Sequence, residues 1–309
     1  AAGIITLWEG LSRPITIALA RSSAIILTMS ALWLNIMALA NLYNNPDYSR
    51  DDYRSIAAHL DAAHRTGDAI LLNAPNQWEV FTYYYPDDPH VIPLASSRPL
   101  DAKEQIEDLV SITSRYQRLF VIFWGEKQSD PDQVIEHWLS NNTFKAEDRW
   151  YGAVRVSTYS TPQNMTRIQK RVSTGFGDSI ILEDYTLNSA TFNPGDILQI
   201  SLGWTSNFQL LDRYKVFVHV YDDTESPPIS QHDSEPGGGL KSTHKWQVGE
   251  TVIDKHGVIL PANLAPGEYQ LAVGMYNLET GDRLPTIQNN ELQGDRLVLG
   301  TITVRSQTQ

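Results

Sequence analysis

The feature that most constrains this chain is an uncharged apolar stretch near its N-terminus, residues 22–42. It reads SSAIILTMSALWLNIMALANL and, at about 21 residues, is long enough to cross the roughly 30 Å hydrocarbon layer of a membrane as a helix. Arg13 and Arg21 precede it, and no acidic residue follows before Asp47. Because basic residues mark the cytoplasmic flank, the sequence predicts an inside N-terminus, a single span in the cell membrane and an extracytoplasmic C-terminal bulk.

Two other interpretations of this stretch stay open. Ala38-Leu39-Ala40 resembles a signal-peptidase site, so a cleaved export signal is one alternative, and a buried core helix is the other. The apolar run is longer than a usual signal core, and more than 20 residues precede it, which favours the span.

Polar and aromatic side chains interrupt the stretch. Trp33 and Asn35 predict contacts with other membrane helices or subunits, because an amide left unpaired in lipid is costly. Another apolar segment, residues 4–11, lies before Arg13, and the chain begins without Met. We therefore expect a larger membrane part upstream of residue 1.

Composition limits the classes of partner. A length of 309 residues predicts two or three domains at about 150 residues each. The net charge of −12 argues against nucleic acid and against peripheral binding to anionic lipid. The absence of cysteine excludes disulfides, thiol catalysis and Cys-ligated zinc.

After a membrane anchor, residues 1–44, the segment 45–160 alternates helix and strand patterns. This alternation predicts a three-layer α/β domain with a mostly parallel sheet. We expect helices over 49–64, 75–85, 101–116 and 131–139, and strands over 69–72, 90–94, 119–124 and, as a terminal strand or hairpin, 144–158. Asp101, with Glu104 three residues on, is the expected cap of the third helix.

Polar side chains follow two of these expected strands. Asn73, Asn76 and Gln77 follow one, and Trp124 and Glu126 follow another. Because right-handed crossovers place parallel strands side by side, their carboxyl ends share an edge, where we expect these residues to converge. Amides and a carboxylate beside an indole suit a neutral polyhydroxyl ligand better than a phosphate. The alternatives are turn and cap residues, or contacts to a missing membrane domain.

The rest of the chain lacks the alternation of helix and strand patterns. Residues 161–177 are polar and basic and predict a linker. Residues 178–305 contain about seven short strand patterns separated by turns, which predict an antiparallel β-sandwich. Tyr214 and Trp246 are candidate glycan-binding rings, with a core role as the alternative.

No catalytic set and no cofactor motif stand out. The sequence contains no GxGxxG, no Walker A loop and no Gly-x-Ser-x-Gly. The histidines of the β region have no compact ligand spacing, so no metal site is predicted among them; they are His219, His232, His244 and His256.

Several segments resemble a known family. Residues 43–54 (YNNPDYSRDDYR) follow the apolar stretch directly, and 67–70 (GDAI) and 73–81 (NAPNQWEVF) come next. They are similar to the C-terminal portion of bacterial family 39 glycosyltransferases, the protein-mannosyltransferase-like GT-C enzymes. The β region is similar to the sandwich appended to some of them, through 194–196, 216–219, 231–233, Trp246 and 267–269.

The resemblance implies a multi-span membrane enzyme that uses a polyprenyl-phosphate sugar donor. The family's catalytic acid lies in an early extracytoplasmic loop, and no position of this chain matches that loop, so no catalytic residue is assigned. The resemblance thus implies the extracytoplasmic tail of a glycosyltransferase-like protein, with a glycan or lipid-linked sugar as partner. A non-enzymatic, single-span accessory subunit of a larger membrane complex and a glycan-binding module are the alternatives.

Overall fold

The computed structural model describes residues 14–44, 51–74, 76–86, 88, 90–94, 100–162, 167–223 and 225–306. The chain divides into two compact units, Ala1–Asp52 and Tyr53–Gln309. The residues expected to form an upstream apolar segment, 4–11, lie outside the described part of the chain.

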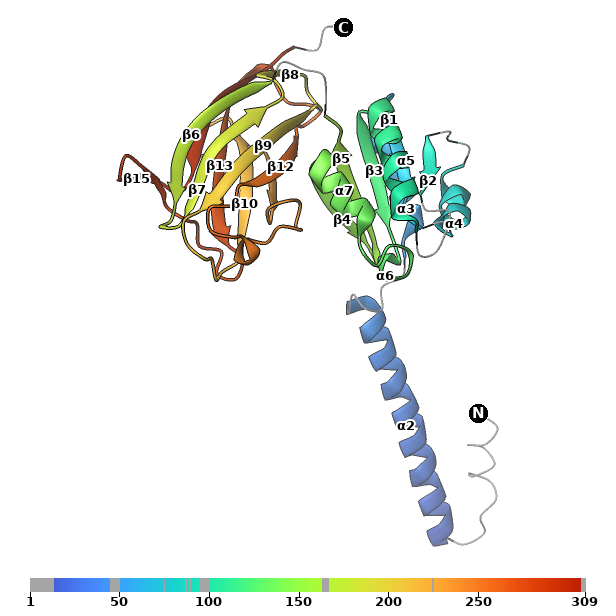
Figure 1. Ribbon diagram of the computed structural model, residues 1–309. Helices are drawn as coiled ribbons and strands as arrows, with labels where there is room; N and C mark the ends of the chain where they lie inside the picture. The colour runs from blue at the N-terminus through green and yellow to red at the C-terminus, as the bar shows by residue number, and fades with distance from the viewer. Residues whose placement is uncertain are drawn as a thin grey trace. The chain divides into compact units, whose positions relative to one another are not determined.

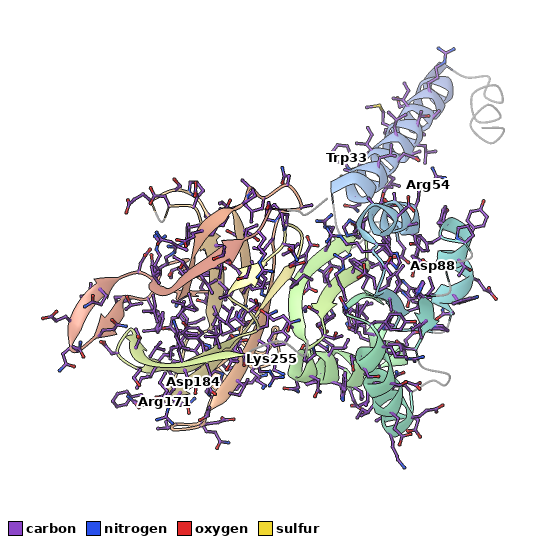
Figure 2. The ribbon with its side chains drawn as sticks, turned by 90° about the horizontal axis from the view of Figure 1, so that it is seen from above. Trp33, Arg54, Asp88, Arg171, Asp184 and Lys255 are labelled. Atoms are coloured by element: carbon purple, nitrogen blue, oxygen red, sulfur yellow. The ribbon has the colours of Figure 1, made fainter. Side chains whose placement is uncertain are left out.

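The first unit contains one long helix, α2 (Pro14–Asn44) (Figure 1). Its segment Arg21–Asn41, 21 residues long, is the one described helix apolar enough to cross a membrane. This confirms an N-terminal helix of spanning length, a criterion that a signal sequence also meets; the topology stays a prediction. Trp33 lies exposed on its surface (Figure 2).

Polar side chains of this helix bond to its own backbone. The Asn35 Nδ2 donates to the Ala31 carbonyl over 2.7 Å, and the Thr28 hydroxyl donates to the Ala24 carbonyl over 2.8 Å. The Asn35 amide therefore has a donor satisfied without a neighbouring helix, which weakens the reason to expect a partner at that residue.

The second unit begins with alternating helices and strands, as the sequence predicts. The helices are α3 (Tyr53–Ala63), α4 (Gln77–Tyr84), α5 (Ala102–Arg115), α6 (Glu126–Ser129) and α7 (Val134–Asn142). The strands are β1 (Asp68–Leu72), β2 (Val91–Pro93), β3 (Arg118–Phe123), β4 (Phe144–Tyr151) and β5 (Val154–Ser160). The predicted cap is present, since the Asp101 carboxylate accepts from the backbone N–H groups of Lys103 and Glu104.

Strand alternation divides the apolar residues between two faces of this sheet. Ile70 and Leu72 of β1 pack with α3 and α4, whereas Ala69 and Leu71 pack with α5 and α7. Helices therefore cover both faces, as expected for an α/β arrangement.

The sheet is less parallel than predicted. β1 pairs in parallel with β2 and β3, but β5 pairs antiparallel with both β3 and β4. The reason is the tight turn at Gly152, whose positive φ of 66° lets β4 return directly as β5 in a hairpin.

The remaining strands form the β region. They are β6 (Ile168–Phe176), β7 (Ile180–Leu187), β8 (Thr191–Phe192), β9 (Ile197–Ser206), β10 (Tyr214–Tyr221), β11 (Ser230–Ser234), β12 (Val252–Ile259), β13 (Gly267–Asn277), β14 (Thr286–Gln288), β15 (Glu291–Gly294) and β16 (Leu297–Val304). A short 3₁₀ turn, η2 (Thr243–Lys245), lies before β12.

Two sheets result. The first has 11 strands in the order β15-β14-β6-β7-β9-β12-β4-β5-β3-β1-β2, and the second has five in the order β11-β10-β13-β16-β8. One apolar cluster draws from both sheets, with Trp204 from β9 and Val218 from β10. A single parallel pairing, His256 with Lys145, joins β12 to β4 and makes the 11-stranded sheet continuous.

Two predictions for this region differ from the structure. Most of the expected linker, 161–177, is strand β6, which pairs with β7 from Ile168 to Phe176. Residues 169–171 and 173 of this strand are exposed and polar. Its sequence therefore lacks the apolar alternation by which a half-buried strand is predicted. The pairing is also not wholly antiparallel, because β8 pairs in parallel with β16.

A buried ion network lies where the α/β part meets the β region. The Glu136 carboxylate on α7 accepts two hydrogen bonds of 2.6 Å from Arg155 on β5 and one of 2.9 Å from Lys145 on β4. Lys145 also donates to the Gly238 carbonyl over 3.4 Å. Burial alone would raise the pKa of Glu136, but the Arg155 hydrogen bonds and the Lys145 charge outweigh it and lower the pKa to about 2.

This depressed pKa predicts acid sensitivity of the fold. Glu136 has a folded-state pKa below its ordinary value of 4.5, so its stabilising effect is present above pH 4.5 and is lost as the pH falls toward 2. We expect the free energy of unfolding to fall by about 3 kcal/mol over that window through this group. Urea unfolding followed by tryptophan fluorescence at a series of pH values measures this.

The matched variants separate Glu136 from other carboxylates. Glu136→Gln should lower stability at pH 7 by about 3 kcal/mol and flatten the acid dependence, because it removes the buried carboxylate that Arg155 and Lys145 share. The carboxylates that remain near these two cations, Asp148 and Glu126, are more exposed to solvent. Glu79→Gln, at an exposed site on α4, should follow the wild type. An acid dependence that Glu136→Gln leaves unchanged would contradict the assignment.

Candidate functional site

Asn73, predicted at the carboxyl edge of the sheet, links the ends of two strands. It is fully buried after β1; its Oδ1 accepts from the Trp124 backbone N–H over 2.8 Å, and its Nδ2 donates to the Ser129 hydroxyl over 3.3 Å. Asn73 and Trp124 therefore do come together, but the amide is used to join β1 to the segment after β3.

Gln77 and Glu126 also bond within the chain. The buried Gln77 Oε1 accepts from the Ala74 N–H over 3.0 Å, and its Nε2 donates to the Tyr53 hydroxyl over 3.2 Å. Glu126 accepts from Arg155 over 3.1 Å, and burial raises the pKa of Glu126. Asn76 is exposed at the start of α4 and makes no capping hydrogen bond with its side chain. This edge therefore presents few of the predicted groups to a ligand.

The aromatic pair predicted in the β region does not form an exposed platform. Trp246 is 3% exposed and belongs to the apolar cluster, where its Nε1 donates to the Lys241 carbonyl over 2.8 Å. Tyr214 is half-buried, and its hydroxyl donates to Asp212 over 3.3 Å. A sugar at the surface cannot stack on the buried indole, so the glycan site predicted at Trp246 lacks its basis.

Three of the four histidines of the β region are paired internally. His219 Nε2 lies 2.9 Å from an Asp233 oxygen, and His256 contacts Asp254 at 2.7 Å and His232 at 2.8 Å. Burial, and next the neighbouring His256, hold the pKa of His232 well below its ordinary value. These contacts indicate a structural role for the imidazoles of His219, His232 and His256.

A crevice with a volume of about 510 Å³ lies where α3, the β4–β5 hairpin and the segment 259–262 meet. We call it the arginine crevice. Its polar lining comprises His59, His64, Arg65, Arg118, Glu147, Arg149, Thr158 and Gln231. Phe120, Leu260 and Pro261 supply apolar wall.

The guanidinium groups of the arginine crevice are held by neighbouring acceptors. Arg118 is bound by Asp68, and Arg149 donates to Glu147 over 2.7 Å. Arg65 donates to the Gly195 carbonyl over 3.1 Å and makes no ion pair within the described residues. Burial, and next the charge of Arg149, lower the pKa of His59. The crevice is therefore cationic in a chain whose net charge is −12, which favours a ligand that carries negative charge or many hydroxyls.

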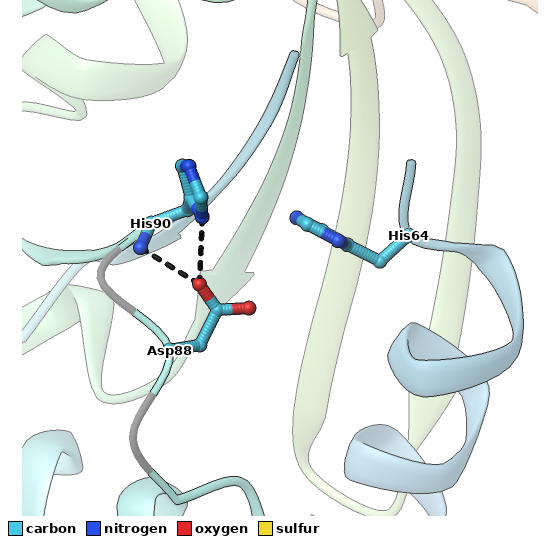
Figure 3. A group of neighbouring side chains, drawn as sticks. All are labelled: His64, Asp88 and His90. Atoms are coloured by element: carbon cyan, nitrogen blue, oxygen red, sulfur yellow. Dashed lines mark hydrogen bonds and ion pairs between the residues drawn. The ribbon is translucent and has the colours of Figure 1, made fainter. Parts of the chain in front are cut away.

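A second cavity, of about 800 Å³, opens on the other side of α3, against the segment between α4 and β2. Here His90 donates from its backbone N–H to the Asp88 carboxylate, and its Nδ1 contacts the same oxygen, each over 2.8 Å. His64, from the end of α3, points toward this pair (Figure 3). One ligand atom from each of the three residues lies within 4.8 Å of the other two.

Electrostatics around this cavity keep its carboxylate ionised. Burial alone would raise the pKa of Asp88, but hydrogen bonds from His90 outweigh it and lower the pKa. Burial, and next the charge of Asp88, raise the pKa of Tyr85 to about 12, so Tyr85 stays protonated at neutral pH.

Sequence patterns did not single out these residues because they lie at the opposite edge of the sheet. β1 and β2 are parallel neighbours, and the Ile70 N–H donates to the His90 carbonyl over 3.0 Å. His64 lies shortly before β1 and His90 immediately before β2. The general rule that ligands bind at carboxyl ends directs attention away from this amino edge. The one local signal is the Asp-Pro-His run, residues 88–90.

Comparisons with known proteins do not assign a family. No family model matches the chain, and no curated protein matches it. Among solved structures, the C-terminal domain of Wzt matches at 11% identity and a TM-score of 0.28, over 47% of this chain and 80% of that one.

Two further structures match at similar levels. The alkylpurine DNA glycosylase AlkC of Pseudomonas fluorescens, bound to DNA, matches at 11% identity and a TM-score of 0.23, over 44% of this chain and 31% of that one. A beta-glucuronidase 2 of Bacteroides uniformis matches at 10% identity and a TM-score of 0.23, over 50% of this chain and 18% of that one. At these TM-scores none of the three similarities supports a conclusion about fold or function.

The contacts of Gln77 predict a structural effect for its removal. Gln77→Ala removes the acceptor of the buried Ala74 N–H and the hydrogen bond to the Tyr53 hydroxyl, so we expect the free energy of unfolding to fall by about 1–3 kcal/mol. Chemical unfolding measures this. Gln128→Ala, at an exposed position on α6, is the control and should change stability by less than about 0.5 kcal/mol. Equal stability of the two variants would show that the Gln77 bonds contribute nothing.

Proposed function

We propose that this chain is the extracytoplasmic tail of a membrane glycosyltransferase-like protein, anchored by α2, and that its folded unit binds a saccharide in the arginine crevice. The observation that carries this proposal is the crevice itself, in which guanidinium donors, a carboxylate and an amide line a cavity of about 510 Å³ beside an apolar wall. A concave site that combines polar groups, which fix orientation, with an apolar wall is typical of small-molecule binding.

The lining suits a sugar that also carries negative charge. The Arg65 guanidinium has no carboxylate partner among the described residues and is available to a phosphate or carboxylate group. Glu147, Thr158 and Gln231 supply acceptors and donors for hydroxyl groups. A lipid-linked sugar combines both kinds of group. The predicted neutral ligand at Asn73 and Gln77 is less well supported, because those amides bond within the chain.

Binding fits the crevice better than sugar transfer or hydrolysis. Sugar hydrolysis generally needs two carboxyl groups that flank the bond to be broken. Among the described residues that line the crevice, Glu147 is the only carboxylate, and it is bound to Arg149. We therefore assign the crevice a positioning role for an acceptor or donor, with catalysis supplied by another part of the protein or complex.

The β region would supply one wall of the crevice. We propose that its two sheets pack as a β-sandwich, which the shared apolar cluster of Trp204 and Val218 supports. The sandwich would then hold in place the part of the crevice wall that it contributes, namely Gly195, Gln231 and the segment 259–262.

A second candidate function is a non-enzymatic accessory subunit of a larger membrane complex. The observation that favours it is the exposure of large side chains around α4, where Trp78, Val80 and Tyr83 are 40%, 45% and 78% exposed. Large exposed side chains gathered on one short helix are typical of an interaction surface. On α2, Trp33 is 62% exposed and available for contact with another membrane helix.

Substitutions in the arginine crevice test the proposed ligand. Arg65→Gln and Arg149→Gln should each weaken binding by about tenfold to a hundredfold, because each removes a charged hydrogen-bond donor. The assay is calorimetric titration of the full chain in mild detergent with a panel of neutral, carboxylated and phosphorylated oligosaccharides.

The control is Arg171→Gln, an exposed arginine on β6 that does not line the crevice (Figure 2). It should bind as the wild type does. If the wild type bound no member of the panel, or if all three variants bound equally well, the crevice would not be a saccharide site.

The predicted topology needs its own test. With the N-terminus inside, a tag at residue 309 should be digested by protease added to intact cells, because Arg13 and Arg21 hold the preceding flank on the cytoplasmic side. A cytoplasmic marker protein in the same cells is the control. A tag that survives until the cells are lysed would place the folded unit inside and would exclude an extracytoplasmic role.

A further inference from the structure

The group formed by His64, Asp88 and His90 is the remaining constellation to which the proposed function gives no role. Two imidazoles and one carboxylate converge from the end of α3 and from the segment before β2 (Figure 3). Their potential ligand atoms lie within 4.8 Å of one another. All three side chains are half-buried, so they are neither free surface groups nor sealed core groups.

His64 has a feature that internal packing does not explain. Its Nε2 is buried and has no hydrogen-bond partner within the described residues. A buried polar atom without a partner costs about 1–3 kcal/mol, and such atoms are uncommon in folded proteins. The other histidine of the group is held in place, because the backbone N–H and the Nδ1 of His90 both contact the Asp88 carboxylate.

The donor set matches one metal in particular. Imidazole nitrogen and carboxylate oxygen are common zinc ligands, with bonds of roughly 2.0–2.2 Å, and tetrahedral zinc keeps such donors roughly 3.3 Å apart. The His90 Nδ1 and the Asp88 oxygen are already 2.8 Å apart. A nitrogen of His64 lies within 4.8 Å of both atoms, so metal binding requires it to approach them by rotation of the His64 side chain. Calcium and magnesium prefer oxygen ligands and fit less well.

We propose that His64, Asp88 and His90 form a zinc site with one open coordination position. Three protein ligands leave the fourth tetrahedral position to a water molecule or to an oxygen of a bound molecule. That position faces the cavity of about 800 Å³, which Arg54 and Asp61 of α3 also line. This site is separate from the arginine crevice, although His64 borders both cavities.

The surroundings of the three ligands support such a site. Metal-bound carboxylates and imidazoles are generally held by further hydrogen bonds that fix their orientation. The His90 backbone N–H donates to the Asp88 carboxylate over 2.8 Å. The His90 carbonyl is fixed by the Ile70 N–H of β1, so the ligand segment is tied to the sheet. Zinc would then connect α3 to the edge strand β2.

The test uses zinc chloride alone and the full chain in mild detergent, after removal of metal with a chelator. Equilibrium dialysis with elemental analysis gives stoichiometry and affinity, and cobalt substitution gives the visible spectrum of a tetrahedral site. We expect one zinc ion per chain in the wild type. His64→Ala, His90→Ala and Asp88→Asn should each weaken binding by at least about tenfold.

His137→Ala is the matched control, because His137 is exposed on α7 and belongs to no such group among the residues that the structure describes. It should bind zinc as the wild type does. His64→Gln replaces His64→Ala if the alanine variant does not fold, as judged by circular dichroism. Zinc should raise the melting temperature of the wild type and of His137→Ala but not that of the ligand variants.

Two results would overturn the proposal. One is a wild-type chain that binds no zinc at micromolar concentrations. The other is binding that survives substitution of all three ligands and is lost when His219 or His256 is replaced, which would place the metal in the β region. Saccharide binding in the Arg65 and Arg149 variants is a separate measurement. A chain that binds no zinc would therefore leave the proposed saccharide site in the crevice untouched.

Discussion

The buried carboxylate of Glu136 is the interaction on which the second unit most depends. It neutralises Arg155 and Lys145, two cations that would be costly to bury alone. Through Lys145 the same network reaches the Gly238 carbonyl in the β region. Gly238 has a positive φ of 66°, and a Cβ there would lie 3.0 Å from the Ser140 hydroxyl, so glycine is needed for this approach. α7, the β4–β5 hairpin and the β region therefore share one network of charges, close to the β12–β4 pairing that makes the 11-stranded sheet continuous.

This assembly gives helix α3 two different surroundings. One side of the helix contributes His59 and Ala62 to the arginine crevice, and another contributes Arg54 and Asp61 to the cavity beside β2. The apolar side, with Ile56 and Leu60, is used by the core. Since helical positions three or four residues apart share a side, an amphipathic helix has room for two polar surfaces around one apolar stripe. His64, at the point where the helix has ended, borders both cavities.

The local architecture was predictable because it depends on patterns within a few residues. The spacing of Tyr53, Ile56 and Leu60 indicates a helix with one buried side, and Asp101 marks a helix start. Strand β6 was not predictable in this way, since its exposed middle carries no apolar alternation. Neither cavity was predictable, because each depends on pairing between distant segments. Knowing that His64 and His90 meet requires the parallel register of β1 and β2, in which Ile70 lies opposite Val91.

Residue type alone predicted the candidate sites less well than did the hydrogen bonding and burial of each polar atom. Asn73 and Gln77 are the groups a ligand would need, but their amides already satisfy buried backbone and hydroxyl groups. The same holds for Asn35 of α2, because its amide donates to the backbone of its own helix. The His64 Nε2 differs, because it is buried within the described part of the chain and no partner contacts it. Burial has removed water from this nitrogen without giving it a hydrogen bond, so any group that binds the nitrogen stabilises the fold. Because Asp88 and His90 lie beside it, the proposed zinc ion fits this role best.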